Sequence, residues 1–280
     1  MVQQAAVVTR WFAMALLTGA TVLYAYQFLM KRELMAWWAR FATGAAFVTL
    51  TASIGLQSRA TGGTELSGHN QLVLLAWALL LVYFVVEHLV KVKVYGTFLV
   101  PVSLVLMVVA QFLAGAEPRG LSPAALEQLD DWRIGIHVGL IVFANAGFFI
   151  GGAASALYLA LDVQLKRHKA SALLRRLPSL AQTQTLARRA ITLAFPAYTA
   201  GILLGTIRAV ETDVQGWWAD PRVMMSGVVW LVFGLYLLLL YRHEVSGRTA
   251  SLLAVLGLAC VVVLAVLART LPTGFHVFGL

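Results

Sequence analysis

The sequence predicts an all-α fold, a polytopic transmembrane helical bundle of about eight helices, from three observations. Of its 280 residues, 60% are hydrophobic and only 12% are charged, which is too little charge for the surface of a water-soluble protein. The apolar residues form continuous runs of membrane-spanning length, whereas a β-barrel would show short alternating segments. The basic residues between the runs sort to one side of a membrane.

A membrane-spanning helix needs roughly 20 apolar residues. Eight runs satisfy this length, over about residues 6–30, 38–57, 71–91, 95–115, 132–161, 190–210, 223–241 and 249–269. We expect the first run to be a retained helix and not a signal peptide, because no basic segment precedes it and no small-residue cleavage site follows it. Together the runs predict one integral membrane domain over residues 1–280.

The loops between the runs predict the orientation of the helices. Of the 21 lysine and arginine residues, 14 fall on one side of the predicted bundle, and most acidic residues fall on the other. The positive-inside rule then makes both termini extracytoplasmic, in a multi-pass protein of the inner (cytoplasmic) membrane. This sorting also accounts for the sequence pI of about 10.1, so we expect the lipid bilayer, and no nucleic acid, as a partner.

The same rule makes residues 162–189 a basic cytoplasmic loop and residues 211–222 an extracytoplasmic tryptophan-rich loop. Residues 173–186 have some amphipathic character, so part of the basic loop would lie along the inner lipid surface. Alternatively, the loop is solvated and only sets the topology. Pro178 would interrupt a helix in it, and His168 is expected to be an ordinary surface histidine.

The stretch Gly216–Trp230 reads GWWADPRVMMSGVVW and sets two adjacent tryptophans and an Asp-Pro-Arg turn between two apolar runs. Pro221 favours a turn over a continuous helix through Trp217 and Trp218. These two tryptophans either belong to the aromatic belt found at membrane surfaces, or they form a shelf on which a flat cofactor lies.

Three of the six histidines, His69, His137 and His276, fall on the same side as the tryptophan-rich loop. His137 lies about five residues into its run, which is roughly 8 Å below the membrane surface at 1.5 Å per residue. A lone histidine at such a surface is usually a hydrogen-bonding residue, but histidines that converge with tryptophans favour haem. Indole rings stack on a porphyrin, neutral imidazole ligates its iron, and arginines pair with its propionates. The arginines on that side include Arg133, Arg208, Arg222 and Arg269.

Other chemistries find little support in the sequence. It contains no HExxH, P-loop, GxGxxG or CxxC motif, and its single cysteine, Cys260, lies within an apolar run. Glu87, next to His88, is the one carboxylate expected within the membrane, whereas proton and ion pumps need charged relays there. A small-molecule transporter stays open as an alternative and would require a polar cavity at mid-membrane.

The segment GTIRAVETDVQGWWADPRVMMSGVVWLVFGLY resembles the WWD domain of the CcsA/ResC/HemX-like cytochrome c assembly family. The residues at the family's spacing are Gly205, Ala209, Glu211, Trp217, Asp220, Pro221, Trp230 and Tyr236. Three further segments resemble family segments: LVLLAWALLLVYFV with Trp77, DWRIGIHVGLIVFANAGFFIGG with His137, and the tail GFHVFGL with His276. The resemblance covers about residues 70–280.

The resemblance implies a haem-handling membrane protein of cytochrome c assembly, similar to CcsA of system II, that presents a non-covalent b-type haem at the outer face. Together with the chemistry of the residues, the resemblance assigns four cofactor-binding roles: axial ligand of the iron, aromatic shelf, turn, and partner of a propionate. These are His137 and His276 as ligands of the iron; Trp217, Trp218 and Trp230 in the shelf; Asp220 and Pro221 in the turn; and Arg222 beside a propionate. It further implies apocytochrome c and a second assembly subunit as partners, with this chain at most one subunit of a haem ligation complex.

The chain departs from the family pattern at several positions. Four family tryptophans are replaced, by Arg208, Asp213, Ala219 and Met225. Val223 stands for a glutamate, and Leu238 stands for the membrane-embedded histidine. These losses favour an alternative, a HemX-like regulator or scaffold of haem biosynthesis that does not use haem as a reactant. Its working surface would be the basic loop 162–189, whereas retention of both outer histidines favours haem holding.

Overall fold

The computed structural model describes residues 1–30, 32–61, 68–90, 95–113, 132–167, 177–213, 215–242 and 245–270. Every regular element in these residues is helical. The α-helices are α1 (Val2–Met30), α2 (Glu33–Thr61), α3 (Gly68–Val90), α4 (Gly96–Leu113), α6 (Trp132–Lys166), α7 (Leu180–Glu211), α8 (Pro221–Tyr241) and α9 (Gly247–Thr270), and a short 3₁₀ helix, η3 (Trp217–Ala219), precedes α8. Each predicted apolar run corresponds to one α-helix, so the polytopic helical fold is confirmed.

Six of these helices are long and apolar enough to cross a membrane: α1, α2, α6, α7, α8 and α9. In the described part of the chain, α3 and α4 carry shorter apolar stretches, Leu72–Val85 and Gly96–Phe112. Pro101 and Pro196 lie inside α4 and α7 without ending either helix, as transmembrane helices tolerate. The chain is therefore a multi-pass membrane protein.

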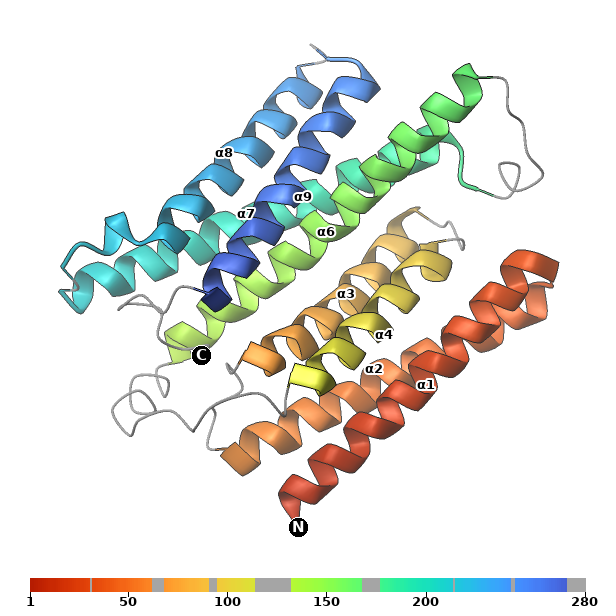
Figure 1. The fold of residues 1–280 in the computed structure, drawn as a ribbon, viewed down its shortest axis with the longest axis horizontal. Coiled ribbons are helices and arrows are strands. Elements are labelled where there is room, and N and C mark those ends of the chain that lie inside the picture. Colours follow the sequence, from red (N-terminus) through yellow and green to blue (C-terminus); the bar gives the residue numbers. More distant parts are fainter. Residues whose placement is uncertain are drawn as a thin grey trace. The chain divides into compact units, whose positions relative to one another are not determined.

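The single membrane domain expected over residues 1–280 contains two compact units, α1 to α4 and α6 to α9. In the first unit, drawn from red to yellow in Figure 1, α1 packs against both α2 and α4, and α3 packs against both α4 and α2. Side-chain bonds also join these helices. Ser53 on α2 donates to the carbonyl of Ala6 on α1 at 3.0 Å, and Trp77 on α3 donates to the Thr51 hydroxyl on α2 at 2.8 Å.

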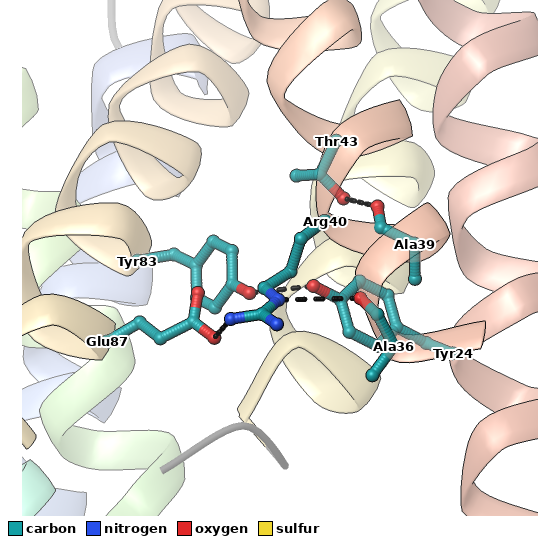
Figure 2. A network of polar contacts seen from close by, with 7 residues as sticks. All are labelled: Tyr24, Ala36, Ala39, Arg40, Thr43, Tyr83 and Glu87. Atoms are coloured by element: carbon teal, nitrogen blue, oxygen red, sulfur yellow. Dashed lines mark hydrogen bonds and ion pairs between the residues drawn. The ribbon is translucent and has the colours of Figure 1, made fainter. Parts of the chain in front are cut away.

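A polar network crosses the interior of the first unit (Figure 2). The hydroxyl oxygens of Tyr24 on α1 and Tyr83 on α3 lie 2.7 Å apart, and both side chains are buried. One turn further along α3, Oε1 of Glu87 lies 3.9 Å from a guanidinium nitrogen of Arg40 on α2. These contacts involve three helices. Tyr24 and Tyr83 are buried and Glu87 is 13% exposed, whereas the Arg40 side chain is 37% exposed.

The second unit, drawn from green to blue in Figure 1, has an aromatic core. The ring of Phe148 on α6 stacks on that of Phe233 on α8 with centroids 3.8 Å apart, and the edge of Tyr198 on α7 completes the group. Small and branched residues fill the remaining space: Ala144, Ile191, Ala194, Val229, Ala250 and Ala254. Burial of these faces of α6, α7, α8 and α9 against one another fixes the positions of the helix ends that carry the candidate site.

The helices extend into the segment predicted as the basic loop 162–189. α6 continues to Lys166, and α7 begins at Leu180. Ser179 caps α7, since its hydroxyl accepts from the amide of Gln182 while the Gln182 side chain accepts from the Ser179 amide. Pro178 lies just outside this cap, in agreement with its expected incompatibility with a helix interior. Residues 168–176, including His168, lie outside the described residues.

Candidate functional site

His137 lies in the second turn of α6, and its ring Nδ1 is 2.7 Å from the main-chain carbonyl oxygen of Gly201 on α7. A carbonyl oxygen only accepts hydrogen bonds, so Nδ1 is the donor, and in the neutral imidazole Nε2 then keeps its lone pair. Metal-ligating histidines commonly show this arrangement, in which the ring nitrogen that does not bind the metal donates to a carbonyl or carboxylate. The bond to Gly201 thus prepares His137 for ligation through Nε2.

The ring of His137 fits against α7 because residue 205 has no side chain. A Cβ atom at Gly205 would lie 2.8 Å from Cε1 of His137 and 3.1 Å from Nδ1, closer than van der Waals contact allows. Gly201 and Gly205 are one turn apart and therefore share one face of α7. The imidazole lies along this face, at the seam between α6 and α7.

Charged residues lie at the end of the same seam where α6 begins and α7 ends, which we call its outer end because it is further from the middle of both helices than His137. A guanidinium nitrogen of Arg133 on α6 is 2.7 Å from Oε2 of Glu211 on α7, and a guanidinium nitrogen of Arg208 is 3.9 Å from the same oxygen. Arg133 precedes His137 by one turn of α6, and Arg208 follows Gly205 by about one turn of α7, so the three groups share the His137 face of the seam. We call Arg133, Arg208 and Glu211 the outer charged cluster.

The tryptophan-rich loop folds into a tight turn before α8. Gly216 adopts a left-handed backbone with φ of +73°, and Asp220 accepts a hydrogen bond from the amide of Arg222 at 2.7 Å. Pro221 occupies the first helical position, where it loses no intrahelical hydrogen bond. Asp220 therefore caps α8, and the local geometry agrees with the turn expected from Asp220 and Pro221.

The tryptophans of the predicted shelf lie on two elements, η3 and α8. Trp217 and Trp218 are in η3, at the same end of the second unit as the start of α6 and the end of α7 (Figure 1), and Trp218 is 68% exposed. Trp230 lies nine residues beyond Pro221, roughly 13 Å along α8. Its indole N–H donates to the Thr199 hydroxyl at 3.0 Å, and its ring stacks on Phe195. Trp230 thus packs α8 against α7, away from η3.

Arg222, expected beside a propionate, is only 7% exposed at the first turn of α8. The side chains of Arg133 and Arg208 are 41% and 29% exposed, so they are more accessible to an anionic ligand.

His276 lies outside the described residues, as do His168 and His243 and the side chains of His69 and His88. The described residues fit one side of a haem site. His137 offers a neutral Nε2, Trp218 offers an exposed aromatic ring, and arginines lie one turn from the histidine.

Sequence reasoning selected His137 but missed the Gly201 carbonyl that orients it, and it did not assign Glu211 a role in the site. The available signal was the pair of glycines one turn apart, Gly201 and Gly205, within an apolar run. Small residues at this spacing permit another helix or a ring to approach the backbone closely.

Comparison of the sequence with known proteins identifies one family. Residues 66–276 match the family model described as "Cytochrome C assembly protein". A "Cytochrome c biogenesis protein CcsA" of Pyropia yezoensis is 24% identical, with 83% of this chain and 84% of that protein covered. Proteins of the same name from Prochlorococcus marinus (strain MIT 9303) and Chlamydomonas reinhardtii are 25% and 28% identical, with 84% and 77% of this chain and 81% and 62% of those proteins covered.

Proposed function

We propose that this chain, which belongs to the cytochrome c assembly protein family, holds a non-covalent, b-type haem at the extracytoplasmic face of the membrane for cytochrome c assembly. The observation that carries the proposal is the 2.7 Å contact between Nδ1 of His137 and the Gly201 carbonyl. In the neutral imidazole this contact places the proton on Nδ1, leaves the Nε2 lone pair available and fixes the ring, as an axial ligand of iron requires. When bound, haem supplies the group that is destined for attachment to a cytochrome.

The other site residues would then have distinct roles. His276 is proposed as the second axial ligand, and Trp217 and Trp218 as the aromatic surface beside the porphyrin. Asp220 and Pro221 hold the turn that carries these tryptophans. Arg222 is nearly buried and would therefore support the turn from within the protein. Trp230 is hydrogen-bonded to α7 and would therefore hold α8 in place.

The proposal requires the outer ends of α6 and α7 to face the extracytoplasmic side. Arg188, Arg189 and Arg242 lie at the opposite end of the second unit, as the positive-inside rule expects of its cytoplasmic end. An inner-membrane location with both termini outside is part of this proposal. Apocytochrome c and a second assembly subunit would be the partners, because the described part of this chain has no large outer domain to hold a cytochrome.

A HemX-like regulator of haem biosynthesis is the second candidate. It is favoured by the replacement of family tryptophans by Arg208, Asp213, Ala219 and Met225 and of the embedded histidine by Leu238. In this case the basic segment 162–189 would contact a cytoplasmic partner, and the outer histidines would not bind haem.

Visible absorption spectra of the detergent-purified chain, with haem added and then reduced with dithionite, separate the two candidates. Haem holding predicts a sharp Soret band and resolved reduced bands typical of bis-histidine ligation, and loss of these features in His137→Ala and His276→Ala. A chain that stays colourless after haem is added would reject haem holding and leave the regulatory function.

A further inference from the structure

The outer charged cluster lies where the carboxylates of a ligand on His137 would arrive. Along α6, Arg133 is four residues before His137, so the two side chains are separated by roughly 6 Å of helix rise. Along α7, Arg208 is three residues after Gly205, the residue that contacts the His137 ring. The seam therefore has two layers, an imidazole layer and, further out, a layer of two arginines.

Glu211 occupies the position between these arginines. Its Oε2 is 2.7 Å from a guanidinium nitrogen of Arg133 and 3.9 Å from one of Arg208. A carboxylate is the group that guanidinium ions recognise best, through charge and paired donors. Glu211 thus offers the arginines the same chemistry that a ligand carboxylate would offer.

The ion pairs of this cluster are easily exchanged. The side chains of Arg133 and Glu211 are 41% and 42% exposed, and ion pairs at such exposure contribute little to stability. Arg208 stands where the family pattern has a tryptophan, so this second arginine is a feature of this chain's own sequence.

We propose that Glu211 is a resident carboxylate that holds Arg133 and Arg208 beside His137 and is exchanged for a carboxylate of the incoming tetrapyrrole. The inference rests on the proposed haem-holding function. It adds that the ligand is recognised through its carboxylates and that Glu211 competes with them. Arg133 and Arg208, not the nearly buried Arg222, bind the ligand carboxylates. While Glu211 occupies the arginines, it weakens the binding of the ligand.

The test is an absorbance titration of the full chain in detergent with two probes, haem and haem dimethyl ester, whose carboxylates are blocked. Glu211→Gln should bind haem about two- to fivefold more tightly, the factor that corresponds to up to about 1 kcal/mol for an exposed ion pair. Arg133→Gln and Arg208→Gln should each bind haem about tenfold more weakly, equivalent to about 1.4 kcal/mol. None of the three substitutions should change the affinity for the ester.

Asp162→Asn is the matched control, because it removes an ion pair with Lys166 (2.8 Å) at the opposite end of α6. It should leave both affinities unchanged. If the wild-type chain binds haem and Glu211→Gln binds it equally or more weakly, the exchange is contradicted while haem holding stands. An equal effect of Arg133→Gln on haem and ester would also overturn the inference. A wild-type chain that binds no haem overturns both proposals.

Discussion

Both compact units contain an arginine–glutamate pair between neighbouring helices, but the two pairs have different surroundings. In the first unit Arg40 and Glu87 are 3.9 Å apart, Arg40 is 37% exposed but Glu87 only 13%, and a hydrogen-bonded pair of buried tyrosines lies one turn away along α3. In the second unit Arg133 and Glu211 are 2.7 Å apart, both are about two-fifths exposed, and the next side chain inward is His137. Only the glutamate of the first pair is enclosed by its helices, whereas both side chains of the second pair are accessible and lie beside His137.

This difference indicates different consequences of substitution. The buried tyrosines of the first unit have no solvent to replace a lost partner, so removal of one hydroxyl lowers the free energy of unfolding. Groups at the accessible pair can be hydrated, so their removal changes stability little and binding more. We therefore expect the first unit to respond in stability and the second in haem affinity.

The largest effect is expected at Gly205, where a side chain would displace the His137 ring. Gly205→Val places its Cβ within 2.8 Å of Cε1, so the ring should leave the Gly201 carbonyl and the bis-histidine spectrum should be lost. The control is Gly227→Val on α8, where an added Cβ meets nothing within 4 Å. Both variants carry the same helix-propensity cost. Equal spectra in the two variants would contradict the assignment of His137.

The next effect is expected in the first unit and concerns stability. Tyr83→Phe leaves the buried Tyr24 hydroxyl without its 2.7 Å partner, which should cost about 1–3 kcal/mol of unfolding free energy. The midpoint of thermal unfolding in detergent measures this loss. The double variant Tyr24→Phe/Tyr83→Phe should be less destabilised, because neither hydroxyl remains. A change in the haem spectrum of either variant would contradict the expectation that substitutions in the first unit affect stability and not haem binding.

The smallest effect separates the two classes of tryptophan. Trp218→Ala removes a ring that is 68% exposed, so stability should be nearly unchanged while haem affinity falls about two- to tenfold, as for the loss of 0.5–1.5 kcal/mol of aromatic stacking. Trp230→Ala removes the bond to Thr199 and the contact with Phe195, so it should lower the unfolding temperature first. If Trp230→Ala instead lowered haem affinity and Trp218→Ala lowered the unfolding temperature, the cofactor surface would lie on α8.

Much of the fold follows from the sequence because the bilayer imposes one dominant constraint. Helix length and apolar composition are set by membrane thickness, so each predicted run corresponds to one observed helix. The observed helices are longer than the predicted runs at the end of α6 and at the start of α7. α6 continues to Lys166, and the Ser179 cap begins α7 before its apolar run. Hydropathy measures burial in lipid and does not detect a polar helical extension or a capping box.

The candidate site was only partly predictable from the sequence. His137 and the Asp220–Pro221 turn follow from residue type and local spacing. The Gly201 carbonyl contact, the exposure of Arg133 and the bond of Trp230 to α7 depend on the register between helices distant in sequence. Periodicity within a single helix does not determine that register, and for this reason spacing alone groups Trp230 with Trp217 and Trp218.

The central claim, that His137 ligates haem iron through Nε2, is tested most directly by cavity rescue. In His137→Gly the imidazole is removed from the α6–α7 seam, so the chain should lose the low-spin spectrum of the haem-loaded protein. Free imidazole added in solution should restore that spectrum in the variant and leave the wild-type spectrum unchanged. A low-spin spectrum in His137→Gly without added imidazole would contradict the claim.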